Sequence, residues 1–99
     1  MPTATATVGS KILASTSDYQ TVEGNVYFPP SSLVDQSALS TSHTHSTCPW
    51  KGKASYYDIT VDGKTLKDAA WYYPSPKDKA QHIKDYVAFY TTKVNVSVA

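Results

Sequence analysis

The sequence predicts a mainly β fold, built as a single domain over residues 1–99 with one short helix near residues 76–85. Three observations lead to this prediction. A chain of 99 residues suits one small domain. Its hydrophobic content of 40% and charged content of 17% suit a packed core rather than a disordered chain. Apolar and polar residues alternate along residues 57–61 and 94–98, which is the period of a half-buried strand.

The first part of the chain is expected to contain four short strands, over residues 4–8, 11–15, 21–22 and 26–28. Gly9-Ser10 lies between the first two and suits a two-residue hairpin turn. Pro29-Pro30 ends the fourth strand, because proline has no N–H to donate to a ladder. The residues that follow Pro30 are predicted to form one helical turn over 31–36 and then a flexible polar loop over 37–47.

The second part begins with the clearest strand signal, over residues 54–61. Its period of two places Tyr57, Ile59 and Val61 on one face. Asp62-Gly63 follows directly and indicates a tight hairpin. Return strands are then expected over residues 64–66 and 69–73, the second ended by Pro74.

The helix near residues 76–85 is predicted from its start signals. Ser75 is expected to cap it and Pro76 to occupy the first helical position, where a missing N–H costs nothing. Ala80 and Ile83 mark the inner face. Two further strands are expected after it, over residues 86–90 and 94–98.

Composition argues against several classes of function. The formal charge is +1, from nine lysines and no arginine, and the lysines are scattered, so we expect no nucleic-acid partner. No apolar run approaches the roughly 20 residues of a membrane helix, and the start of the chain lacks a secretory signal pattern, so a cytoplasmic protein is expected. Neither a phosphate loop nor a dinucleotide fingerprint is present, so no cofactor is predicted.

Residues 47–57 gather the most chemistry. Cys48 is a candidate nucleophile if a nearby cation activates its thiol, although a free cysteine is also a common small buried residue. Lys51-Gly52 could contact an anion, since glycine permits close backbone approach and lysine supplies a point charge. Glu23, the only glutamate, could act as a general base, pair with Lys51, or simply bond turn N–H groups.

His43 and His45 could offer two imidazoles to a metal, because strand residues two apart point the same way. A third ligand such as Cys48, Asp58 or Glu23 would be required, so an exposed polar loop is favoured and no metal is predicted.

Eight tyrosines and two tryptophans form the aromatic set. They could be core, or walls of an aromatic box that closes over a flat or cationic small molecule. The members considered for such walls are Trp50, Trp71, Tyr56, Tyr73 and Tyr90. Tyr57 and Tyr72 are expected on the opposite strand faces from Tyr56 and Tyr73.

Four ordered blocks carry a family resemblance, over residues 23–30, 48–56, 69–76 and 83–90. They resemble the small bacterial and fungal family catalogued as domain of unknown function 427, which also carries a nucleotidyltransferase-like label. This resemblance implies a compact β-tent domain similar to Mss4, methionine sulfoxide reductase B and the cereblon ligand-binding domain. Those relatives often hold zinc through paired cysteines, which this chain lacks.

The function expected from these residues is binding of an unidentified small molecule, with enzymatic activity left open. A pocket is predicted between the segment 48–56 and the strand 71–74. The predicted site has Cys48 and Glu23 for reactivity, and its ligand-binding residues are Trp50, Lys51, Gly52, Tyr56, Trp71 and Tyr73. The alternatives are a hydrolase or transferase that uses Cys48, and a protein-interaction or self-assembly module without catalysis. The chain could be a monomer or a homodimer.

Overall fold

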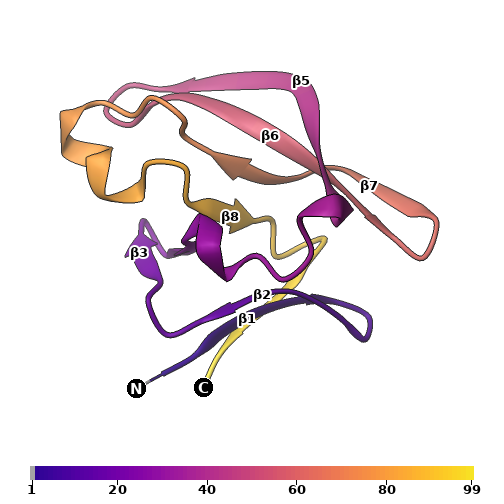
Figure 1. The fold of residues 1–99 in the computed structure, drawn as a ribbon. Helices are drawn as coiled ribbons and strands as arrows, with labels where there is room; N and C mark the ends of the chain where they lie inside the picture. Colours follow the sequence, from indigo (N-terminus) through magenta and orange to yellow (C-terminus); the bar gives the residue numbers. More distant parts are fainter. Residues whose placement is uncertain (1) are drawn as a thin grey trace.

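The computed structural model describes residues 2–99, which fold into two antiparallel β-sheets (Figure 1). The smaller sheet has the order β2-β1-β9 and consists of β1 (Ala4–Val8), β2 (Lys11–Thr16) and β9 (Asn95–Val98). The larger has the order β3-β4-β8-β7-β6-β5 and consists of β3 (Gln20–Val22), β4 (Asn25–Phe28), β8 (Val87–Phe89), β7 (Lys64–Tyr72), β6 (Gly52–Val61) and β5 (Leu39–Cys48). The mainly β prediction is therefore confirmed.

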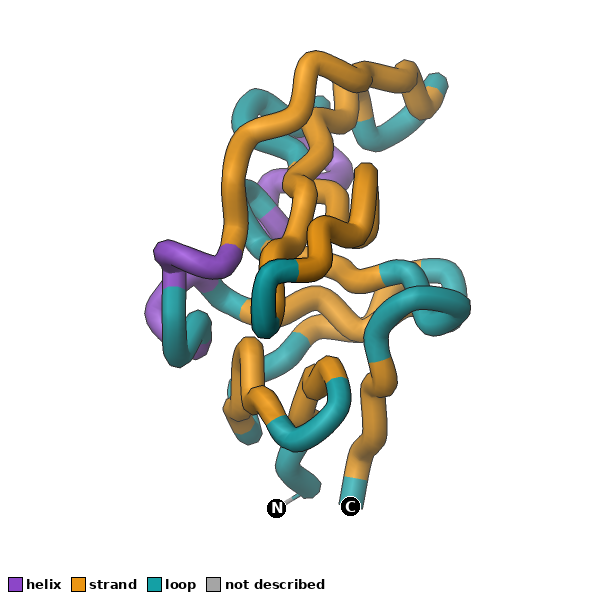
Figure 2. The backbone as a smooth tube through the Cα atoms, turned by 90° about the vertical axis from the view of Figure 1, so that its right-hand side faces the viewer, coloured by secondary structure: helices purple, strands orange, loops and turns teal. Residues whose placement is uncertain are grey.

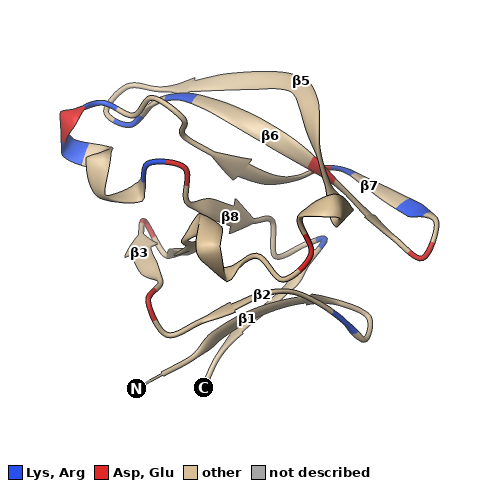
Figure 3. Ribbon diagram, in the orientation of Figure 1, with Lys and Arg blue, Asp and Glu red and all other residues tan. Residues whose placement is uncertain are grey.

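Three short 3₁₀ helices complete the described chain: η1 (Pro30–Ser32), η2 (Gln36–Ala38) and η3 (Asp78–Ile83). None of them is long and apolar enough to cross a membrane. Charged residues lie at separate places along turns and strand ends rather than in one block (Figure 3).

The main core fills the space between the two sheets, which Figure 2 shows as an upper and a lower layer. Small side chains dominate the side contributed by the smaller sheet, where Ala4, Ala6 and Ala14 are fully buried. Phe28 and Phe89 pack edge to face across the larger sheet, with ring centroids 5.5 Å apart. Tyr57, Ile59 and Val61 all contact this core, as the alternation of β6 predicts.

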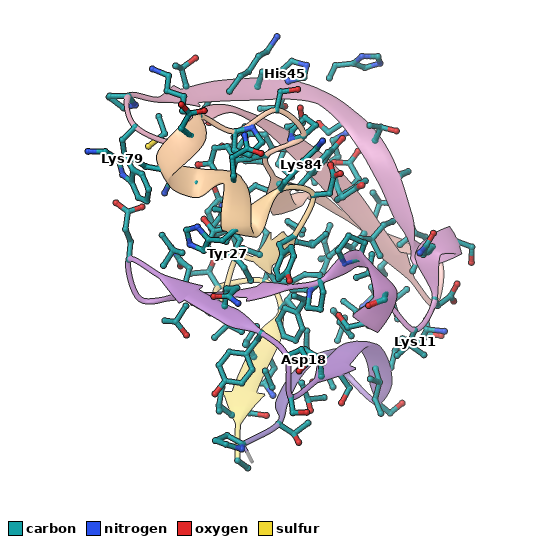
Figure 4. The ribbon with its side chains drawn as sticks, turned by 60° about the vertical axis from the view of Figure 1, so that its left-hand side comes forward. Lys11, Asp18, Tyr27, His45, Lys79 and Lys84 are labelled. Carbon is teal, nitrogen blue, oxygen red and sulfur yellow. The ribbon has the colours of Figure 1, made fainter. Side chains whose placement is uncertain are left out.

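A second, smaller core lies on the opposite face of the larger sheet, where η3 covers it. Ala80 and Ile83 of η3 are fully buried there, as predicted, beside Tyr27 of β4 (Figure 4). Tyr73 belongs to this cluster while Tyr72 packs on the main core, so the predicted division of these tyrosines between faces is confirmed.

Both hairpins that the sequence predicts are present in the structure. Gly9-Ser10 joins β1 to β2, and Asp62-Gly63 joins β6 to β7. Gly9 and Gly63 have positive φ angles of 59° and 77°, which glycine adopts without steric cost.

The predicted flexible loop over residues 37–47 is wrong, because β5 occupies most of it. Leu39 pairs with Ile59, and Cys48 pairs with Gly52, with an irregularity between Thr41 and His45. The Asp68 carboxylate of β7 bridges that irregularity by accepting from the hydroxyls of Ser42 and Thr44. A polar strand forms here since its backbone pairs with β6 while its side chains face solvent.

Three smaller expectations are also corrected. Residues 64–66 and 69–73 are not separate strands, since β7 runs continuously to Tyr72 through a bulge near Asp68, where φ is 50°. The single turn expected over 31–36 is replaced by two short helices, η1 and η2, which overlap the two ends of that range. Ser75 does not cap the helix: the cap position of η3 is Lys77, which makes no capping bond through its side chain.

Candidate functional site

The candidate site is built on the loop that joins β5 to β6, formed by Pro49, Trp50 and Lys51. Gly52 ends this loop with φ at 110°, a backbone conformation that side chains rarely allow. A Cβ at Gly52 would also lie 3.4 Å from the carbonyl oxygen of Ser75. The sequence Lys51-Gly52 therefore lets the segment before η3 pack directly on the loop.

Two hydrogen bonds hold that packing in place. The backbone N–H of Lys77 donates to the carbonyl of Lys51 at 2.9 Å. The Lys77 ammonium donates to the carbonyl of Pro49 at 2.8 Å. The loop is thus fixed on both sides of Trp50.

Lys51 is the only buried lysine in the described chain, with 6% of its surface exposed. Its Nζ lies 5.3 Å from the centroid of the Trp50 ring and 5.5 Å from that of Tyr73, within range of cation–π attraction. The ammonium donates a hydrogen bond to Oε1 of Glu23, which completes an ion pair. A buried charge of this kind is costly unless it is paired, and here the aromatic faces and Glu23 supply the pairing.

Glu23 reaches Lys51 from the turn between β3 and β4. Its φ of 55° is left-handed, as is the φ of 79° at Gly24, which matches a tight hairpin turn. The Glu23 side chain is 51% exposed, whereas that of Lys51 is 7% exposed. The carboxylate therefore lies between the buried ammonium and solvent.

The environment keeps this pair charged. Burial lowers the pKa of Lys51, but the hydrogen bond to Glu23 and the neighbouring Tyr27, Tyr73 and Cys48 outweigh it, so the pKa lies above its ordinary value. The hydrogen bond from Lys51 lowers the pKa of Glu23, with a smaller contribution from Trp50. Both groups remain ionised at neutral pH.

Cys48 lies at the end of β5, half-buried at the margin of the second core and close enough to Lys51 to affect its pKa. The histidines considered as partners are on another part of β5. His45 shares a hydrogen bond of 3.3 Å with Ser55 and lies on the outer side of the molecule (Figure 4). Within residues 2–99, no three side chains among His, Cys, Asp and Glu gather closely enough to hold a metal ion.

An aromatic ladder runs beside the Lys51 site. The Trp71 indole N–H donates to the Tyr27 hydroxyl at 3.1 Å. The centroid of the Trp71 ring lies 4.6 Å from the centroid of the Tyr90 ring. Tyr90 stacks in turn on Tyr56, whose hydroxyl shares a hydrogen bond of 2.7 Å with Ser46. Burial, together with Tyr56, raises the pKa of Tyr90 to about 12.

The structure thus brings some of the predicted residues together and separates others. Those gathered around the ammonium are Glu23, Cys48, Trp50, Lys51, Gly52 and Tyr73. Tyr56 and Trp71 belong to the adjoining ladder, joined to the site through Tyr27. Sequence reasoning missed Tyr27 and Lys77, although both lie next to the matched blocks or within them.

Two hollows on the described chain lie away from this site. One, of about 330 Å³, is beside Tyr57, and the other, of about 230 Å³, is beside the Gly9 and Asp62 turns. Neither is lined by a residue predicted for the site. A pocket at Lys51 therefore stays a prediction.

Fold and site define a small, mainly β domain with one buried cation held between aromatic rings. The sequence model of the family described as Domain of unknown function (DUF427) matches residues 3–99, so the chain belongs to that family. No curated protein matches the chain.

Proposed function

We propose that this chain is a small-molecule-binding domain that recognises an anionic group of its ligand at Lys51. The observation that carries the proposal is the burial of this one lysine ammonium between two aromatic rings, with a half-exposed turn glutamate as its charged partner. Stability alone gives little reason for such an arrangement, because an apolar residue of similar size usually serves a core at least as well.

The geometry also supports a direction of approach. Glu23 lies on a turn and covers the ammonium from the solvent side, and Trp50 is 36% exposed beside it. A ligand carboxylate or phosphate that displaces Glu23 would meet the ammonium, while its flat part would lie against Trp50. The β-tent, Mss4-like arrangement implied by the resemblance stays a prediction beside this one.

The test compares Lys51→Met with Lys53→Met, since Lys53 is an exposed lysine only two residues away. We expect Lys51→Met to remain folded, with a free energy of unfolding within about 2 kcal/mol of the parent, because methionine fills a similar apolar volume while the ion pair with half-exposed Glu23 is lost. Thermal unfolding is measured with benzoate and with adenosine monophosphate as anionic probes. Stabilisation of the parent and of Lys53→Met, but not of Lys51→Met, would support the proposal.

Two results would overturn this proposal. One is the absence of stabilisation of the parent by either probe at high concentration. The other is equal stabilisation of all three proteins, because the anion would then bind elsewhere.

A cysteine-dependent hydrolase or transferase is a second candidate, favoured by the proximity of Cys48 to the Lys51 ammonium. Iodoacetamide labelling of the folded protein below pH 8.5, the ordinary pKa of a thiol, would support it. Labelling of Cys48 only after unfolding would exclude it.

A further inference from the structure

The larger of the two hollows described above lies on the other face of the larger sheet from Lys51, beside Tyr57. Its volume of about 330 Å³ is at the lower end of the range of ligand sites, about 300–1,000 Å³. Apolar walls are supplied by Pro30, Leu33, Leu39 and Val87. Apolar and polar surface thus contribute about equally to the wall.

Three polar side chains also line the hollow: Gln36, Tyr57 and Asp85. Asp85 is the only charged residue among the lining residues. Its carboxylate takes part in no salt bridge within residues 2–99, whereas the three acidic residues that do are Glu23, Asp35 and Asp58. An unpaired negative charge beside an apolar wall favours a ligand of positive charge.

The aromatic wall is held rigidly. Tyr72 stacks on Tyr57 with ring centroids 4.4 Å apart and planes 17° from parallel. Burial raises the pKa of Tyr57, with smaller contributions from Tyr72 and then Asp85, and Tyr57 and Asp85 both line the hollow. The electron-rich ring and the carboxylate together provide the two groups that attract an organic cation.

Asp85 is also fixed by its backbone. Its φ of 63° is left-handed, and its N–H donates to the carbonyl of Tyr73 at 3.1 Å. The neighbouring Lys84 forms an isolated parallel bridge with Tyr73, which anchors the same segment to the end of β7. Aspartate adopts this conformation readily, and the two backbone contacts fix the position of Asp85 beside the end of β7.

We propose that this hollow is a second binding site, and that it takes a small organic ammonium ion, with the ammonium on Asp85 and the apolar part against Tyr57. This site is independent of the anion site at Lys51, because the two share no lining residue and lie on opposite faces of the sheet.

The test uses three probes of nearly equal shape and different charge: benzylamine, benzyl alcohol and benzoate. Each is titrated into ¹⁵N-labelled protein at constant ionic strength, and the amide shifts around Tyr57 and Asp85 are followed. We expect saturable shifts with benzylamine, at the weak affinity of a ligand with so few atoms, and none with the other two. Equal shifts with benzyl alcohol, or no saturable shift with benzylamine, would overturn the proposal.

Asp85→Asn is the diagnostic variant, since asparagine keeps the left-handed backbone and removes the charge. Asp62→Asn is its matched control, because Asp62 also has a left-handed φ, of 51°, and does not line this hollow. We expect Asp85→Asn to weaken benzylamine binding roughly fivefold or more, and Asp62→Asn to leave it unchanged. An equal loss of benzylamine affinity in both variants would contradict the assignment of the ammonium to Asp85. If Asp85→Asn fails to fold, the comparison of the three probes on the parent protein still decides whether the hollow selects an ammonium ion.

Discussion

At the scale of single residues, the ion pair between Lys51 and Glu23 joins a buried group to a half-exposed one. The aromatic rings of Trp50 and Tyr73 stay in place whatever the charge of Glu23. Protonation of this one carboxyl therefore leaves the ammonium with cation–π contacts alone. Acid is thus expected to loosen the turn that carries Glu23 before it affects the rest of the site.

The pH dependence of this pair follows from the lowered pKa of Glu23. A carboxyl whose pKa falls on folding adds stability that is complete above its unfolded value of about 4.5 and is lost as the pH falls through the folded value. We expect the parent to unfold at a higher temperature than Glu23→Gln at pH 7, and the difference to vanish on acidification below pH 4.5. A difference in unfolding temperature between the two proteins that does not change with pH would contradict the ion pair.

Sequence reasoning found most residues of this site, and the pairing of Glu23 with Lys51 was one of the roles that it left open. The glycine after Lys51 and the single glutamate stood out by composition and position, so both were predicted. Burial of a lysine cannot be read from periodicity, because Lys51 lies in a loop and its cover comes from Glu23 and Tyr73, 28 and 22 positions away in the chain. Asp85 lies within the matched block 83–90, but its neighbours in the sequence do not indicate that it lines a hollow with Tyr57, 28 positions earlier in the chain.

At the scale of elements, β5 is the edge strand that the sequence does not reveal. Its ten residues carry no apolar alternation, and six of them are serine or threonine. A strand that is solvated on one side and paired by its backbone needs no such pattern. The strong turn dipeptides Gly9-Ser10 and Asp62-Gly63 fix their hairpins locally, which explains why those elements were predicted correctly.

Helix η3 lies within the predicted range 76–85, but it begins at Asp78 rather than at Pro76. Ser75 and Pro76 resemble an α-helical start, yet the N–H of Lys77 donates to Lys51 and the Gln81 side-chain amide donates to the carbonyl of Pro76. These bonds engage backbone groups of Pro76 and Lys77 outside a helical ladder. A six-residue 3₁₀ helix results, with Ala80 and Ile83 facing the core as the spacing predicts.

The attachment of β5 to the sheet gives a prediction for Asp68. Its carboxylate bonds to Ser42 and Thr44 where the backbone pairing with β6 is interrupted. We expect Asp68→Ala to speed hydrogen exchange of the β5 amides near Thr44 roughly tenfold, without a similar effect in β1. Asp68→Asn keeps the left-handed backbone and an acceptor, so it should show a smaller change. Equal exchange rates of the β5 amides in the parent, Asp68→Ala and Asp68→Asn would show that the Asp68 carboxylate does not hold this strand.

At the scale of the whole molecule, small side chains of the lower sheet fill much of the space between the two sheets. Ala4, Ala6 and Ala14 of the lower layer are fully buried against the aromatic and branched residues of the upper layer. Sheets packed in this way tolerate little added volume. The many alanines therefore set the spacing of the layers, which a count of hydrophobic residues alone would not indicate.

This packing predicts the effect of an enlarged side chain. Ala6→Leu is expected to lower the free energy of unfolding by about 1–3 kcal/mol, because the extra atoms must displace the facing sheet. Ser97→Leu, at an exposed position of β9, is the control and should change it by about 0.5 kcal/mol or less. Urea denaturation of the two variants measures both values. Equal changes would show that the space between the layers is not filled.

The position of the chain ends has a mechanical consequence. β1 pairs antiparallel with β9, and Thr3 and Ala99 exchange two backbone hydrogen bonds at the open end of that pair (Figure 1). A force that pulls the two ends apart would load these bonds one rung at a time, since tension acts across an antiparallel ladder that begins at the point of attachment. Stretched from its ends, the molecule should yield by unzipping at low force, although its interior is closely packed.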